Sequence, residues 1–184
     1  MLYYKGVYAN ELREELTMKS LKKVVAATLV GAMLLPLAGC AKKIERIRAK
    51  DFENALEEVF DDDEYGSYSG TVYCFEDHYV IAFTTMDDDD DARDEWEDLM
   101  EEFEDMKDDK DFDGRSRLVD RGEYGYILLD GECDDGDFAN GRGYYYGGIF
   151  YVEDELFMIL TDKDKDDYRA DIDTILRALG LPRP

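Results

Sequence analysis

The sequence has few of the residues from which catalytic sites are commonly built. It contains one histidine, His78, and three cysteines in 184 residues. No nucleophile-elbow pattern surrounds Ser67, Ser69 or Ser116, and no predicted base lies beside Cys133. Paired carboxylates for hydrolysis carry no information in a chain this acidic. We therefore assign no catalytic residue and expect a protein that is not an enzyme.

Positive charge is also scarce. The chain has 22 Lys and Arg against 47 Asp and Glu. The first 39 residues hold 5 of the basic and 3 of the acidic residues, so residues 40–184 carry 17 against 44, a net charge of −27. Such a surface repels phosphates, which excludes nucleic acid as a natural partner. It favours cations, cationic peptides or simple solubility.

The chain lacks an apolar run long enough to span a membrane. Val24–Leu35 is about 12 residues long, whereas a spanning helix needs about 20. Three lysines precede the run, and small residues follow it before Cys40. This order of charged, apolar and small residues is typical of a secretory signal peptide.

The residues Leu37-Ala38-Gly39-Cys40 resemble the lipobox of bacterial lipoproteins, where a peptidase cuts before a cysteine that carries a diacylglyceryl thioether. The resemblance covers Met18–Cys40. It implies lipidation of Cys40, with palmitate among the acyl chains, and a lipid-anchored protein on the extracytoplasmic face of the cell membrane. Ala41 after the cysteine implies inner-membrane retention in an organism with two membranes.

Met1–Thr17 do not fit a signal peptide, which normally starts at the N-terminus. Arg13-Glu14-Glu15 can be encoded by AGG-GAG-GAA, a purine run typical of a ribosome-binding site, at about the usual distance before Met18. We therefore expect translation to start at Met18. The alternative is a real extension that unfolds during export.

The expected domains are a lipidated cysteine with a basic juxtamembrane segment over residues 40–50, and a single acidic domain over 51–184. The basic charges of Ala41–Lys50 contribute up to about 1 kcal/mol each against anionic headgroups. Ile44 and Ile47 continue into the apolar stripe of Phe52–Phe60, so the spacing predicts a helix that begins close to the membrane.

The remaining apolar patterns predict strands, helices and one long loop. The expected strands are Thr71–Phe75, Tyr79–Phe83, Leu118–Leu129, Tyr144–Val152 and Leu156–Leu160, with a loop over Asp130–Gly143. One helix follows Asp87–Asp91 with Ala92, Trp96, Leu99, Phe103 and Met106 inward, and another spans Lys165–Leu179.

Val72–Thr84 aligns with Ile149–Thr161 at an offset of 77 residues. Each segment is followed by an acidic stretch and an amphipathic helix, which favours two ββα repeats, although any two hairpins with acidic turns look alike. The expected fold is α+β, an antiparallel sheet of about five strands with helices mainly on one face.

Cys74 and Cys133 are candidates for a disulfide, because the domain is expected outside the cytoplasm. A cysteine in a strand is as often a small buried hydrophobic residue. Both alternatives, a disulfide and a buried free cysteine, are compatible with the sequence.

Asp109, Asp111, Asp113 and Asp120, with Gly114, have the spacing of an EF-hand calcium loop. The twelfth residue is Asp and not Glu, the eighth is Ser116, and a strand is predicted to follow. Calcium at this loop is the one cofactor hypothesis that the sequence offers.

Tyr144, Tyr145 and Tyr146 form an aromatic cluster that could stack on a glycan or a peptide. Alternate residues of a strand face opposite ways, so Tyr145 is outward if the other two pack inward. The sequence thus predicts a non-catalytic binding module whose partner is wall glycan, a peptide or another envelope protein. The alternatives are a calcium-responsive structural module and a small cell-envelope hydrolase.

Overall fold

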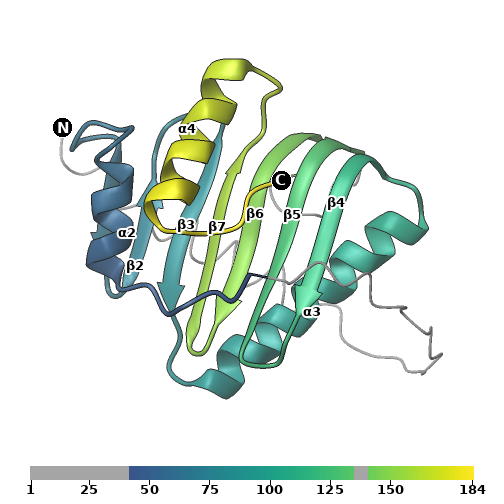
Figure 1. Cartoon of the computed structure of the whole chain (residues 1–184), viewed down its shortest axis with the longest axis horizontal. Coiled ribbons are helices and arrows are strands. Elements are labelled where there is room, and N and C mark those ends of the chain that lie inside the picture. The colour runs from purple at the N-terminus through teal and green to yellow at the C-terminus, as the bar shows by residue number, and fades with distance from the viewer. Residues whose placement is uncertain (1–41, 135–140) are drawn as a thin grey trace, which may run out of the picture. The chain divides into compact units, whose positions relative to one another are not determined.

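The computed structural model describes residues 42–134 and 141–184, which belong to a compact unit spanning Cys40–Pro184. These described residues form three α-helices and one antiparallel sheet of seven strands, in the order β1-β2-β3-β7-β6-β5-β4 (Figure 1). The α+β class is confirmed, but the sheet is larger than the five or so strands expected. The strands are β1 (Tyr65–Tyr68), β2 (Thr71–Cys74), β3 (Tyr79–Thr85), β4 (Phe112–Asp120), β5 (Tyr124–Cys133), β6 (Gly143–Val152) and β7 (Glu155–Thr161).

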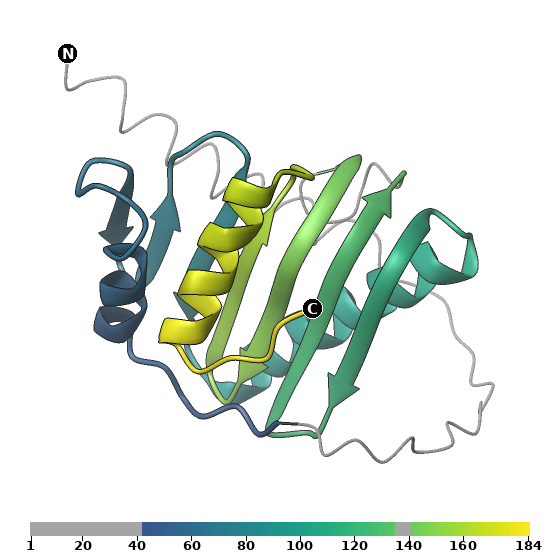
Figure 2. The ribbon, with the colours of Figure 1, turned by 45° about the horizontal axis from the view of Figure 1, so that its top comes forward.

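Helices cover both faces of the sheet, whereas we expected them mainly on one. α2 (Ala49–Leu56) and α4 (Asp166–Ala178) share one face, and α3 (Asp89–Asp108) crosses the other (Figures 1 and 2). Side chains alternate accordingly along β5, where Leu128 joins the core under α2 and α4 and Ile127 joins the core under α3. We call these two surfaces the α4 face and the α3 face.

The two helices predicted in the middle and at the end of the chain are confirmed. The Asp88 carboxylate caps α3 by accepting the Asp91 N–H at 2.9 Å. The predicted inward stripe of α3 is buried: Ala92, Trp96, Leu99, Phe103 and Met106. α4 buries Ile172, Ile175 and Leu176, and Gly180 after it has a φ of 66°, which suits glycine at a helix end.

Of the two edge strands, β1 is not predicted by the apolar pattern, and β4 is predicted only over its last three residues. Of the nine residues of β4, Val119 alone is buried, because the strand lies at the edge and is polar on both faces. The single strand expected over Leu118–Leu129 is two strands, connected by residues 121–123. β5 also continues to Cys133, so Asp130 lies in a strand and not in the predicted loop.

The predicted ββα repeat is not supported. Phe83 and Leu160 align at the 77-residue offset, but Phe83 belongs to the core on the α4 face and Leu160 to the core on the α3 face. A repeat of two hairpins that lie side by side in one antiparallel sheet would place both following helices on the same face. α3 and α4 lie on opposite faces, so the likeness of the two segments comes from their shared hairpin pattern.

The helix expected to begin near the membrane starts later, at Ala49. Residues 42–48 have no regular secondary structure, yet Ile44 and Ile47 are buried in the core on the α4 face. Their burial was predicted correctly and their conformation was not. This extended segment forms part of the candidate site.

Candidate functional site

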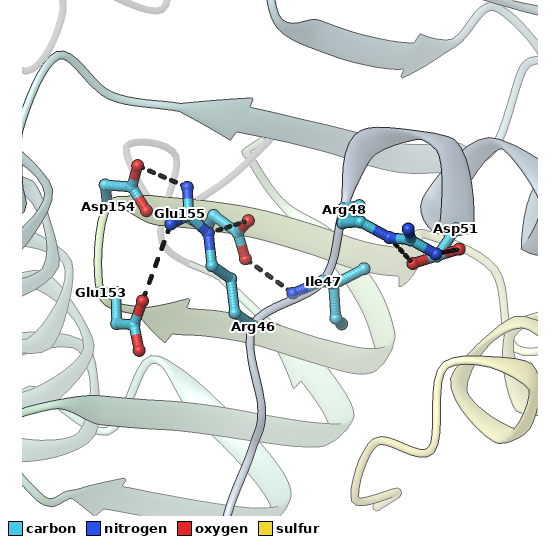
Figure 3. A network of polar contacts seen from close by, with 7 residues as sticks. All are labelled: Arg46, Ile47, Arg48, Asp51, Glu153, Asp154 and Glu155. Carbon is cyan, nitrogen blue, oxygen red and sulfur yellow. Dashed lines mark hydrogen bonds and ion pairs between the residues drawn. The ribbon is translucent and has the colours of Figure 1, made fainter.

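Residues 42–48 are held on the sheet by the side chain of Arg46 (Figure 3). Its Nε donates to Glu155 Oε1 at 3.1 Å, and its Nη2 donates to Asp154 Oδ2 at 2.7 Å. Its Nη1 lies 3.8 Å from Glu153 Oε2. All three carboxylates come from the β6–β7 hairpin, so one guanidinium group ties the start of the domain to that hairpin.

Glu155 is the buried member of this cluster, with a side chain 2% exposed. Its Oε2 accepts the Ile47 N–H at 2.8 Å, so the carboxylate binds the backbone of the segment as well as Arg46. Burial raises the pKa of Glu155 above its ordinary value of 4.5, although the Ile47 N–H and Arg46 act to lower it. The path of residues 42–48 is therefore fixed by polar contacts in addition to the two buried isoleucines.

A hollow of about 610 Å³ lies beside this segment on the α4 face. Lys42, the end of α4 and the C-terminal tail line it. Tyr146 donates to Asp173 at 2.9 Å in its wall, and Arg183 donates to the same carboxylate at 3.3 Å. Lys42 and Arg177 are exposed there. Positive charge thus gathers next to the predicted anchor in an otherwise acidic domain.

A second polar cluster surrounds Asp130, whose side chain is 6% exposed. It accepts hydrogen bonds from Arg169 at 2.7 Å and from Tyr144 and Arg115. The Arg169 guanidinium also lies 4.5 Å from the centre of the Tyr146 ring. Burial alone would raise the pKa of Asp130, but its three donors outweigh burial and lower the pKa below 3.8. The cluster holds α4 against β4, β5 and β6.

The four aspartates of the predicted calcium loop do not converge on one point. Asp109 is the C-cap of α3, Asp111 precedes β4, and Asp113 and Asp120 lie near opposite ends of that strand, about 23 Å apart. Asp120 pairs with Arg93 at 2.7 Å. In the part of the chain that the structure describes, no group of three or more His, Cys, Asp or Glu side chains is placed to hold a metal ion.

The two candidate disulfide cysteines lie far apart. Cys74 is on β2, half-buried against the core of the α4 face, and Cys133 is on β5 in the core of the α3 face. Four strand spacings separate them, about 19 Å, whereas a disulfide needs Cα atoms within about 7 Å. The fold therefore rules out this bond. The Cys133 Sγ lies 3.3 Å from Met106 Sδ.

The three consecutive tyrosines alternate between the faces as expected. The prediction that Tyr145 is outward is wrong, because α3 covers that face, and the three rings do not form a stacking surface. Tyr145 is 1% exposed in the core under α3, and its hydroxyl donates to the Gly141 carbonyl at 2.6 Å. The hydroxyls of Tyr144 and Tyr146 bind Asp130 and Asp173. All three side chains therefore serve the packing of β6.

His78 lies at the β2–β3 turn, with a φ of 76°. Its ring makes an edge contact with Tyr168 at 5.7 Å, and its Nδ1 lies 3.2 Å from Asp162. His78 is in the turn before β3, whereas Cys133 is on β5, three strands further along the sheet. The structure does not bring them together as a catalytic pair.

The residues that organise these contacts, Arg46, Glu155, Asp130 and Arg169, were not predicted. The sequence offers one weak signal for Glu155, which stands at the start of an apolar strand where a charge requires a partner. Arg46 itself is 109 residues away in the chain, so no local pattern joins the two.

The predicted lipobox and signal peptide lie outside the described residues. Within the described ranges, no helix is long and apolar enough to cross a lipid bilayer. No family model matches the chain, and neither a curated protein nor a solved structure is significantly similar to it.

Proposed function

We propose that the chain is an extracytoplasmic lipoprotein, held to the cell membrane by lipidated Cys40, whose acidic domain binds a partner at the cell surface without transforming it. The observation that carries the proposal is the sequence of Met18–Cys40: a basic start, an apolar run and Leu37-Ala38-Gly39-Cys40.

The short distance between Cys40 and the core supports an anchored domain. Ile44 is 3% exposed, and four residues of extended chain reach at most about 14 Å. The Arg46 cluster then fixes the segment on the β6–β7 hairpin. A lipid on Cys40 would therefore hold this end of the sheet against the membrane with little slack.

The charges near that end support the same orientation. Lys42, Lys43 and Arg177 are exposed. Each cation close to anionic headgroups contributes about 1 kcal/mol. The acidic remainder of the domain is repelled by the same headgroups, so it faces away from the membrane and is available to a partner.

The anchor is tested by metabolic labelling with a fatty acid in a bacterium that processes lipoproteins. The full chain and a Cys74→Ser control are expected to take up label and partition into detergent, whereas Cys40→Ser is expected to do neither. Equal labelling of Cys40→Ser would contradict the anchor. Surface cross-linking of the labelled protein, with calcium and with a chelator, then tests for a bound partner. If the labelled protein reaches the cell surface and cross-links to no other molecule in either condition, the binding role is contradicted.

A further inference from the structure

The α3 face of the sheet is open over β1 and β2. α3 packs on β4, β6 and β7, and the core beneath it includes no residue of β1 or β2. Tyr68 and Phe75 are 68% and 54% exposed there, and they are the two large apolar side chains of the described residues that are exposed. This part of the sheet is therefore an apolar surface without a covering element among the described residues.

Three aromatic side chains share this surface. Gly66 on β1 pairs with Tyr73 on β2, so the two residues face the same side of the sheet. A β-carbon at Gly66 would lie 3.2 Å from the Phe75 ring, so this ring is on that side as well. The rings of Tyr73 and Phe75 meet edge to face at 4.8 Å. Tyr68 lies two residues beyond Gly66 and so faces the same way. We call Tyr68, Tyr73 and Phe75 the aromatic surface.

The surroundings of the aromatic surface carry charge of one sign. Residues 61–92, which include β1, β2 and β3, contain eleven Asp and Glu and no Lys or Arg. Glu76 and Asp77 are exposed directly after Phe75, and Asp61–Asp63 are exposed shortly before β1. An occupant of the aromatic surface therefore meets carboxylates at its margins and no fixed positive charge from this stretch.

We propose that the aromatic surface binds an Arg- or Lys-rich segment of another envelope protein, an inference that rests on the proposed binding role and names its partner. Arginine and lysine place their aliphatic stems and cationic groups over aromatic rings, while carboxylates at the margin neutralise the charge. β1 is the edge strand of the described sheet, so an extended segment can also pair with its backbone.

Other occupants fit the surface less well. A second copy of this domain would bring another net charge of about −27 against the same acidic stretch, which opposes association. An uncharged wall glycan would stack on the rings but would leave the surrounding carboxylates without a role. Exposed aromatic rings beside carboxylates that no Lys or Arg of this stretch neutralises favour a cationic polypeptide as the occupant.

The test uses the full chain in mild detergent and a fluorescent peptide of alternating Arg and Val, with binding followed by anisotropy. Tyr68→Ser combined with Phe75→Ser is expected to weaken binding about tenfold, because two rings are lost. Glu76→Gln with Asp77→Asn is expected to weaken it as well. The matched control is Asp108→Asn with Asp109→Asn, which removes the same charge near the opposite edge of the sheet.

A peptide of alternating Glu and Val is expected not to bind, and circular dichroism checks that each variant is folded. Equal affinity of the peptide for the wild-type chain and the aromatic double variant would overturn the proposal. So would equal weakening by the two charge-matched variants, or binding of neutral wall-glycan fragments in place of the peptide. Fatty-acid labelling of Cys40 in the same preparations reports separately on the anchor, so failure of the aromatic surface is distinguishable from failure of the proposed lipoprotein.

Discussion

Arg46 and Glu155 are 109 residues apart in the chain, and their side chains meet at 3.1 Å where residues 42–48 cross the β6–β7 hairpin (Figure 3). The two partners differ in environment, since Arg46 is 50% exposed and Glu155 is 2% exposed. Loss of Arg46 leaves a buried carboxylate with the Ile47 N–H as its described donor. Loss of Glu155 leaves an exposed guanidinium group that still pairs with Asp154.

Arg46→Ala is expected to loosen residues 42–48. The free energy of unfolding should fall by about 1 kcal/mol, a modest figure because half of the Arg46 side chain is in solvent. The larger effect should be local, because the Ile47 N–H is held by the same carboxylate. Amide hydrogen exchange measured by mass spectrometry should become faster in residues 42–48 while α3 stays protected.

Arg48→Ala is the matched control for this prediction. Arg48 is 81% exposed, and its pair with Asp51 is local to the start of α2. We expect no change in the exchange of residues 42–47. If both variants accelerate exchange equally, Arg46 does not fix the segment.

Glu155→Gln tests the effect of burial on this carboxyl group. Glutamine keeps an acceptor for the Ile47 N–H and does not titrate. The folded-state pKa of Glu155 lies above 4.5, so the folded state holds the proton more tightly, and the stability that Glu155 contributes falls as the pH rises from 4.5 through that pKa. As the pH rises through this window, the free energy of unfolding of Glu155→Gln, measured with urea, should therefore increase relative to that of the wild type.

Glu153→Gln removes the same charge from the same turn, where the side chain is 52% exposed. It controls for the general effect of reducing the negative charge of the domain. If the two variants change the free energy of unfolding by the same amount at every pH, burial of Glu155 does not govern the pH dependence of stability.

The parts of the fold that were predicted are those whose apolar residues have one clear period. The stripe of α3 and the β6–β7 hairpin are dense enough in large apolar residues to be identified locally. Most of β4 was missed because its edge position needs only Val119 to be buried. Ile44 and Ile47 are three residues apart, a spacing that suits a helix, but tertiary contacts of Arg46 and Ile47 hold them in an extended segment.

The candidate site was less predictable than the fold because its contacts join distant parts of the chain. Asp130 was expected in a loop, and the continuation of β5 to Cys133 places it beneath Arg169 of α4. The aspartates of the calcium pattern have the correct spacing along the chain, but β4 places Asp113 and Asp120 near opposite ends of a strand. In so acidic a sequence, spacing alone does not distinguish a site from a solvated surface.

Asp130→Asn is expected to lower the free energy of unfolding by about 2 kcal/mol at neutral pH, since Arg169 would lose a buried carboxylate partner. The sign of its pH dependence is opposite to that of Glu155. The folded-state pKa of Asp130 lies below 3.8, so its stabilisation is complete above pH 3.8 and is lost as the pH falls through the folded pKa. The deficit of the variant, measured by urea unfolding, should therefore shrink in acid.

Asp164→Asn removes the other carboxylate that Arg169 binds, and the Asp164 side chain is 63% exposed. Its effect on stability at neutral pH should be much smaller than that of Asp130→Asn, because an exposed ion pair contributes little. Equal losses in the two variants would mean that Asp130 does not hold α4 on the sheet.

Gly125→Ala is expected to be the most damaging small change on the α3 face. A β-carbon at Gly125 would lie 2.5 Å from Trp96 Cζ2, and Trp96 is fully buried and stacked on Tyr151 at 5.8 Å, so the ring has no room to yield. We expect a loss of about 3 kcal/mol in the free energy of unfolding.

Gly143→Ala controls for the effect of adding a methyl group to a strand, because the nearest atom to its β-carbon is 3.7 Å away, and its stability should stay within about 0.5 kcal/mol of the wild type. If the clash with the indole is the cause, Trp96→Leu should cost stability alone but relieve part of the Gly125→Ala loss, because the two sites are in contact. Urea unfolding of the four chains measures this coupling. Strictly additive losses would locate the damage elsewhere than at the ring of Trp96.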